Sequence, residues 1–261
     1  MKRLILLLLL PVLFLASNAQ ASLLDSILES KKLKVCFWPE YYGISYINPQ
    51  TQELSGIDVD LAKALASDLH VEVEFVVSSF ATLTPDIQAK KCDIAMFAIG
   101  RTPKRLEKLA LTTPHLASDI YAITSKSNQR IQKWEDIDKS GVVVAVAKGT
   151  YHVAIMQARL KEATLLVVDS MHAREQEVES GRADVFMTDF PFGVRMVEQR
   201  EWAKLIRPET PFHITPYGWA MAQGEDAFLE RVETFIASIK KDGRLYNSAV
   251  THHLEPIVNT E

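Results

Sequence analysis

The sequence is poor in cysteine: its 261 residues include only two, Cys36 and Cys92. So low a count excludes a disulfide-dense secreted scaffold, and the wide spacing of the two forms no zinc motif. Each lies within or beside an apolar segment, where a free cysteine is commonly buried. We therefore expect two buried thiols, although a disulfide is also open to a protein in an oxidising compartment.

Motifs of several common chemistries are also lacking. The chain has no G-x-S-x-G segment of a serine hydrolase and no glycine-rich phosphate-binding loop. His252 and His253 are adjacent, so they point to different faces of a helix and make a poor metal pair. The other histidines are scattered, and we expect them at the surface: His70, His115, His152, His172 and His213. No pattern predicts a metal or an organic cofactor.

Basic charge and long apolar runs are scarce as well. The net charge is −4, which does not suggest a nucleic-acid partner. One long apolar run, residues 4–16, follows two basic residues and precedes the small-x-small cleavage signal at 19–21 (Ala-Gln-Ala). This run is too short to span a membrane. We expect residues 1–21 to be a cleavable signal peptide and the mature chain to begin at Ser22.

The chain does have a regular alternation of strand and helix patterns. Strands are expected at 33–38, 71–77, 94–99, 119–124, 141–147, 164–168, 183–188 and 214–222, and helices at 22–32, 58–69, 85–91, 151–162, 171–180, 225–241 and 244–253. Strands that alternate with helices argue for parallel α/β sheets. The wording at 91–96 (KCDIAM) returns at 182–187 (RADVFM), which indicates two lobes of similar construction.

The stretch from Asp93 to Arg105 is the most informative. A buried strand is expected up to Ile99, and Thr102 followed by proline is a helix-start signal that puts Arg105 at the third helical position. A cation is unfavourable there because a helix N-terminus carries partial positive charge. Either Arg105 binds an anion such as a carboxylate, or its side chain swings out into solvent; the local pattern leaves both open.

Arg105 shares its kind of position with two other polar residues. Thr150 and Asp189 also follow the carboxyl ends of expected strands. Ligands of parallel α/β sheets sit outside those ends, so the shared placement favours a ligand-binding Arg105.

In the order and spacing of its motifs the chain resembles the periplasmic solute-binding proteins of family 3, the polar amino acid binders of ABC uptake systems. The motifs stand at 56–62 (GIDVDLA), 91–96 (KCDIAM), 102–105 (TPKR), 149–150 (GT), 181–184 (GRAD), 188–189 (TD) and 241–243 (KDG). The resemblance implies the α/β, two-lobed type II periplasmic-binding-protein fold, with parallel-rich sheets, helices on both faces and two crossover strands as a hinge. Residues 22–117 with 217–261 would form the first lobe, and residues 118–216 the second.

The resemblance also implies a function: capture of an L-amino acid or related small zwitterion in the periplasm and delivery to the membrane permease of an ABC importer. The protein would be a monomer. Arg105 falls where the family grips the ligand α-carboxylate, and Asp189 where it meets the α-ammonium group. Beside Arg105, Thr150 would add its backbone N–H and its hydroxyl. The Ala98 carbonyl and the Gly100 backbone would complete the ammonium end.

Tyr41 and Phe80 fall where the family often sandwiches the ligand side chain, although aromatic residues at such positions also pack into cores. Trp38 departs from the resemblance, since several basic amino acid binders carry an acid there. This departure favours an apolar or aromatic ligand side chain over a cationic one. Arg101 and Lys148 are further cations near the mouth, and they leave open an extra acidic group on the ligand.

Two rival functions stay open. Some proteins on this scaffold are cyclohexadienyl (arogenate or prephenate) dehydratases, and a loaded binding protein can instead signal to a membrane receptor. As the resemblance aligns, the dehydratases carry their general acid three residues after the aspartate that matches Asp189; here Phe192 stands there and cannot donate a proton. Lys148 is the nearby residue that could replace this general acid, but a lysine in this position is better suited to binding a carboxylate. We therefore expect a binding protein and no enzyme, with Phe192 part of the cleft.

Overall fold

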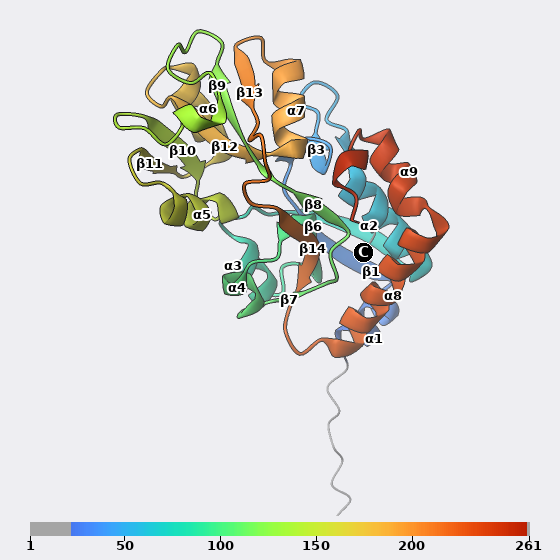
Figure 1. The fold of residues 1–261 in the computed structure, drawn as a ribbon. Helices are drawn as coiled ribbons and strands as arrows, with labels where there is room; N and C mark the ends of the chain where they lie inside the picture. The colour runs from blue at the N-terminus through green and yellow to red at the C-terminus, as the bar shows by residue number, and fades with distance from the viewer. Residues whose placement is uncertain (1–21, 260–261) are drawn as a thin grey trace, which may run out of the picture.

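Two large β-sheets, each covered by helices, form two lobes joined by crossing segments (Figure 1). The computed structural model describes residues 22–259, so the expected signal peptide at 1–21 lies outside the described residues. Between residues 22 and 259, no helix is both long and apolar enough to cross a bilayer.

The first sheet has the strand order β5-β1-β6-β14-β7, with β8 paired to β14. Its strands are β1 (Lys32–Phe37), β5 (Glu72–Val77), β6 (Ile94–Gly100), β7 (Ala110–Leu111), β8 (Leu116–Ser118) and β14 (Thr215–Met221). β5, β1 and β6 are parallel, and every residue of β6 is buried, which explains its unbroken apolar run. The helices of this lobe are α1 (Leu23–Ser30), α2 (Ile57–Asp68), α3 (Leu83–Gln88), α4 (Pro103–Leu106), α8 (Asp226–Asp242) and α9 (Arg244–Thr251).

The second sheet has the order β11-β10-β12-β9-β13 and lies at the top of Figure 1. Its strands are β9 (Ile120–Ser125), β10 (Val143–Ala147), β11 (Thr164–Val168), β12 (Val185–Asp189) and β13 (Ala203–Ile206). β11, β10 and β12 are parallel, whereas β9 is antiparallel to β12 and β13. The helices α5 (Tyr151–Arg159), α6 (Met171–Glu179) and α7 (Phe190–Gln199) pack on this sheet.

The chain passes from the first sheet to the second at Asp119, between the end of β8 and the start of β9. The Asp119 carboxylate accepts backbone N–H bonds from Phe212 (2.9 Å) and His213 (2.6 Å), which lie on the returning segment before β14. β8 and β14 also pair directly. The two crossing segments are therefore tied side by side, an arrangement suited to a hinge. The lobe boundaries at 117/118 and 216/217 stay a prediction.

Most helices and strands lie close to the ranges expected from sequence, but some segments differ. Residues 40–55 form a small sheet of β2 (Glu40–Tyr41), β3 (Ser45–Ile47) and β4 (Leu54–Ser55), which the pattern does not predict. Helix α7 and strand β13 are likewise not predicted. A signal for α7 does exist, because Asp189 caps it and Pro191 stands in its first turn.

The expectation of two buried thiols is wrong. Cys36 and Cys92 form a disulfide, with Cα atoms 5.5 Å apart. Both residues are buried, as expected, but β1 and β6 are neighbouring strands, and their pairing brings the two cysteines together. The sequence does not reveal this proximity, because it depends on the strand order of the sheet.

We predict that reducing the disulfide lowers the stability of the protein. The bond links residues separated by 56 positions, and closing a loop of that length restricts the unfolded chain enough to add about 2–4 kcal/mol to the free energy of unfolding. Urea unfolding with and without reductant measures the loss. The double variant Cys36→Ala/Cys92→Ala is the control and should not respond to reductant. Equal stability of the parent in both conditions would contradict the prediction.

Candidate functional site

Three strands end at a cleft between the lobes, and each delivers one of the expected site residues. β6 leads to Arg105 in α4, β10 to Thr150 at the N-cap of α5, and β12 to Asp189 at the N-cap of α7. Cavities at this cleft have linings from both lobes. The structure thus brings the three residues to one region, as their shared position in the sequence suggests.

The Arg105 side chain lies in the protein and not in solvent. Thr102 caps α4, and its hydroxyl oxygen accepts the Arg105 N–H at 3.3 Å, so the expected helix start is confirmed. The Arg105 side chain is buried; its Nη1 donates to the Gly100 carbonyl (2.9 Å) and its Nη2 to the Gly149 carbonyl (3.1 Å). The second bond crosses from the first lobe to the second.

No carboxylate between residues 22 and 259 forms an ion pair with Arg105. Burial lowers the pKa of its guanidinium to about 10, although the nearby phenol groups oppose that shift. The Phe80 ring lies 5.4 Å from the guanidinium carbon and supplies a weak cation–π contact. Arg105 is therefore a desolvated cation that an anionic group would stabilise.

Asp189 is the matching anion of the second lobe. Its Oδ2 accepts a hydrogen bond from the Tyr217 hydroxyl at 2.8 Å and a second one from the Tyr41 hydroxyl. Its Oδ1 accepts a long bond of 3.4 Å from the Phe192 N–H, the capping bond of α7. Burial raises the pKa of Asp189, and no cation in the described chain pairs with it. A bound ammonium group would favour its charged form.

Three tyrosines form a hydrogen-bonded cluster around this carboxylate. Tyr41 comes from β2, Tyr217 from the crossing strand β14, and Tyr151 from the start of α5; the Tyr151 and Tyr217 hydroxyls lie 2.9 Å apart. Burial raises the pKa of all three phenols, followed in each by the negative charge of Asp189. From sequence, Tyr41 is expected at the ligand side chain and Tyr217 has no expected role, because a strand pattern does not show which carboxylate a side chain meets.

At Gly149 the two lobes touch through their backbones. Gly149 has a positive φ of 81°, and a Cβ added there would lie 2.6 Å from the Ala81 nitrogen. Only glycine allows so close an approach. Beside it, the Thr150 hydroxyl donates to the Ala147 carbonyl at 2.7 Å, so its proton is already used within its own lobe.

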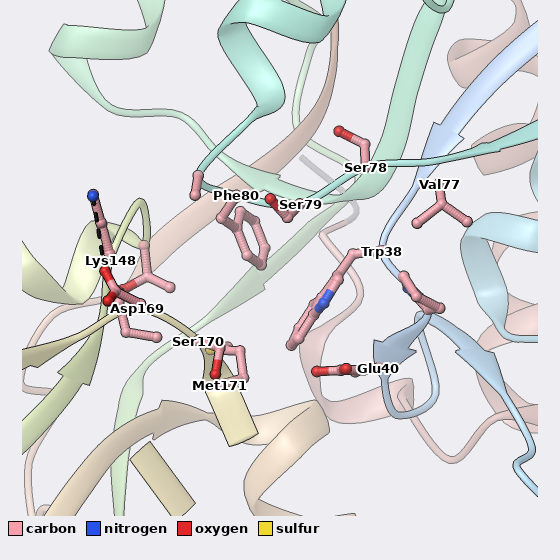
Figure 2. Close-up of a pocket in the computed structure, with 14 residues that line it drawn as sticks. Trp38, Glu40, Val77, Ser78, Ser79, Phe80, Lys148, Asp169, Ser170 and Met171 are labelled. Atoms are coloured by element: carbon pink, nitrogen blue, oxygen red, sulfur yellow. Dashed lines mark hydrogen bonds and ion pairs between the residues drawn. The ribbon is translucent and has the colours of Figure 1, made fainter. Parts of the chain in front are cut away.

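Aromatic side chains form the wall of the cleft beside this contact. The Trp38 and Phe80 rings lie 5.5 Å apart, and Tyr41 packs against both. Figure 2 shows Trp38 and Phe80 on one side of a cavity of about 330 Å³, with Ser170 and Met171 on the other. A second cavity of about 600 Å³ lies on the Arg105 side of Phe80. Trp38 and Phe80 thus face the space where a ligand side chain would lie.

Ala98, near the end of β6, has a positive φ of 49°, which is unfavourable for a residue with a Cβ. Its N–H donates to the buried Asp58 carboxylate at 2.7 Å, and the other Asp58 oxygen contacts Trp219 Nε1 (2.8 Å) and His115 Nε2 (3.2 Å). Asp58 therefore holds the strained backbone just before Gly100. Its place in the motif at 56–62 is explained by this structural role.

We predict that Asp58→Asn lowers the free energy of unfolding by about 1–3 kcal/mol. The Ala98 N–H and the Trp219 Nε1–H donate to different oxygens of Asp58, and an amide keeps only one of these acceptors, so one of the two donors must face its NH2 group. Chemical denaturation measures the loss. Asp60→Asn, two residues later on a more exposed side of α2, is the control and should cost less than about 1 kcal/mol. A variant at Asp58 as stable as the parent would show that the carboxylate does not hold Ala98.

The remaining expected residues are placed as follows. Lys148 is exposed at the cleft mouth and pairs with Asp169 at 3.8 Å (Figure 2). Arg101 donates to the carbonyls of Leu111 and Thr112, so its guanidinium is used within the first lobe and does not serve the cleft. Phe192 is buried against Tyr42, with ring centroids 5.1 Å apart.

The expectation of surface histidines is wrong for two of them. His115 and His152 are buried, because one pairs with Asp58 and the other follows Tyr151 in the first turn of α5. Within residues 22–259, no three His, Cys, Asp or Glu side chains lie together in a way that could hold a metal ion.

Two α/β lobes, a crossing hinge and a cleft with a buried arginine on one side and a buried aspartate on the other define a two-lobed small-molecule-binding protein. Residues 33–252 match the bacterial extracellular solute-binding proteins, family 3. The chain belongs to this family.

Individual relatives include both binding proteins and an enzyme. The chain is 31% identical to the cyclohexadienyl dehydratase of Pseudomonas aeruginosa over 91% of its length and 88% of that protein. It is 25% identical to the L-cystine-binding protein TcyJ of Escherichia coli over 88% and 85%. The crystal structure of an ancestral amino acid-binding protein, AncCDT-1, described as a precursor of cyclohexadienyl dehydratase, superposes with a TM-score of 0.79 at 30% identity and covers 87% of this chain and 98% of that one.

Proposed function

We propose that this protein captures an L-amino acid or a related small zwitterion and delivers it to the permease of an ABC importer. One observation carries the proposal: Arg105 and Asp189 are buried on opposite sides of one cleft, and neither forms an ion pair within residues 22–259. Two buried charges of opposite sign without counter-ions are costly. An α-carboxylate and an α-ammonium group on a single ligand compensate both.

The cross-lobe contacts support binding by closure. Arg105 reaches the Gly149 carbonyl and Tyr41 reaches Asp189, and each bond joins one lobe to the other. Groups divided in this way surround a ligand completely only when the lobes are together. Closure also excludes water, which strengthens charge-assisted hydrogen bonds. Export through a signal peptide at 1–21, a periplasmic location and a monomeric state belong to the same proposal.

The 31% identity to a dehydratase favours turnover of arogenate or prephenate as a second candidate. The residue three positions after Asp189 is Phe192, an apolar ring buried in α7 that cannot protonate a leaving hydroxyl. Burial also raises the pKa of Tyr41, Tyr151 and Tyr217, so these phenols are poor proton donors at neutral pH. Incubation of the protein with both compounds, followed by assay for phenylalanine and phenylpyruvate, tests this candidate. Product above a buffer blank would favour the enzyme.

We predict that the purified chain binds at least one L-amino acid with one-to-one stoichiometry, and that Arg105→Met weakens the binding about 100-fold or more. The methionine fills similar space but removes the only expected cationic partner of the α-carboxylate. A thermal-shift screen followed by calorimetry measures both.

Lys104→Met, which removes an exposed cation from the same helical turn, is the matched control and should leave affinity within about threefold. Melting curves of the unliganded Arg105 variant should stay near those of the parent, because a desolvated cation is removed together with its two carbonyl bonds. A large loss of stability would mean that Arg105 is structural, and a response only to sugars would contradict the proposed function.

We predict that affinity for the amino acid falls at acidic pH. Burial raises the pKa of Asp189 above 3.8 in the free protein, and a bound ammonium group lowers it again. The free protein then holds a proton that the complex must release, so affinity falls about tenfold per pH unit once the pH drops below the raised pKa. Burial lowers the pKa of His152 to about 3, so this ring stays neutral above that pH. Calorimetry from about pH 7 to about pH 4 measures this loss of affinity, and a flat profile would show that Asp189 takes up no proton in the free protein over this range.

A further inference from the structure

The second lobe contains another buried arginine, Arg174, which is not among the site residues expected from the sequence. It lies on α6 with no measurable exposure, and its Nη1 donates to the Met187 carbonyl at 2.7 Å. The guanidinium carbon lies 4.5 Å from the Phe186 ring centroid and 4.6 Å from that of Phe192. Its Nε and Nη2 have no hydrogen-bond partner in the described chain.

The unpartnered atoms are the two that a carboxylate prefers. Nε and Nη2 form one edge of the guanidinium plane, and a carboxylate that meets this edge accepts two parallel hydrogen bonds. Buried polar atoms are almost always paired, so an entire free edge on a fully buried arginine indicates a missing partner. Since the carbonyl bond uses only Nη1, it leaves this edge available.

Arg174 lies close enough to Asp189 for each charge to favour the charged form of the other. Its Nη1 donates to the Met187 carbonyl in β12, two residues before Asp189. The Phe192 ring lies against its guanidinium, and the Phe192 N–H donates to the Asp189 carboxylate. Ser170, the N-cap of the same helix α6, lines the cavity beside Trp38 (Figure 2).

His152 lies near this arginine, and a backbone hydrogen bond with Thr188 favours the charged form of its ring. Burial, and next the charge of Arg174, outweigh that bond and lower the pKa of His152 to about 3, so the ring is neutral. The neutral ring still carries one N–H, which can donate to an anion. The His152 ring is therefore a second possible donor close to Arg174.

The charges of the cluster do not balance. Arg105 and Arg174 contribute two buried cations, whereas Asp189 contributes one buried anion. Glu175, Asp189 and Glu40 favour the charged form of Arg174, but burial outweighs them, and none forms an ion pair with it within residues 22–259. Glu40 and Asp169 at the cavity mouth are exposed, so solvent screens their repulsion of an anionic ligand.

We propose that Arg174, assisted by His152, is a second anion site of this cleft, and that the ligand is an amino acid whose side chain carries an acidic group. This inference rests on the proposed function, since Arg105 and Asp189 are assigned to the α-carboxylate and the α-ammonium group. A ligand with net charge −1 leaves the buried cluster electrically neutral. The extra acidic group that the sequence leaves open thus meets Arg174, and neither Arg101 nor Lys148.

Pairs of acid and amide ligands test the proposal, because they differ almost only in the charge of the side chain. Calorimetry of the purified chain with L-glutamate against L-glutamine, and L-aspartate against L-asparagine, should show the acid of the better-fitting pair bound about tenfold or more tightly. In Arg174→Met this acid-to-amide ratio should fall to about one to three, with the amide affinity little changed.

The ratio separates a ligand contact from a structural role. If Arg174 only supports β12 through the Met187 carbonyl, its loss weakens acid and amide equally and leaves the ratio intact. Arg174→Gln, whose amide can still donate to that carbonyl, repeats the test if the methionine variant folds poorly. Arg182→Met, which removes an exposed arginine paired with Glu177, is the matched control and should keep the parent ratio.

Three outcomes would overturn the inference. In the parent, an amide or another neutral amino acid could bind as tightly as the acids, or the preference for the acid could persist in Arg174→Met. Either result removes the second anion site but leaves the proposed function standing. Failure of every amino acid to bind the parent would instead refute the proposed function itself, together with the inference.

Discussion

The organisation of this protein depends on one carboxylate, that of Asp189. Asp189 ends β12 and caps α7. Its carboxylate accepts hydrogen bonds from the hydroxyl groups of Tyr41, in the first lobe, and Tyr217, in the crossing strand. The same group is therefore a folding element within its lobe and a bond between lobes. An ammonium group that binds Asp189 approaches a carboxylate that two phenols already stabilise by hydrogen bonds. Its own charge-assisted bond must therefore be well aligned to add enough binding free energy.

The cleft is built around charges that the folded chain leaves without counter-ions. Arg105 bonds to carbonyl oxygens, Arg174 to one carbonyl and two aromatic faces, and Asp189 to phenols. These partners satisfy part of the hydrogen-bonding capacity of each group but none of its charge. Stability given up in this way is recovered when a complementary ligand binds, which makes affinity and selectivity depend on the same buried groups.

Much of the fold could be predicted from the sequence, because its signals are local. Apolar runs such as β6, the Thr102 cap and the alternation of strands with helices each depend on neighbouring residues. What could not be predicted depends on strand order: the disulfide between Cys36 and Cys92, and the Asp58 bond to Ala98. For the site, Arg105, Thr150 and Asp189 follow from their positions after strands.

Arg174 could not be predicted in the same way. In the sequence it is one charged residue on a polar helix, and only the tertiary packing buries it against Phe186 and Phe192. The approach of Gly149 to Ala81 is a further product of tertiary packing, with a consequence for the closure of the lobes. Main chain meets main chain there, so no rotamer change can bring the lobes nearer. The backbone contact sets how far the two lobes can close. In the proposed transport role, a permease that recognises the closed form would meet the same outline with every ligand.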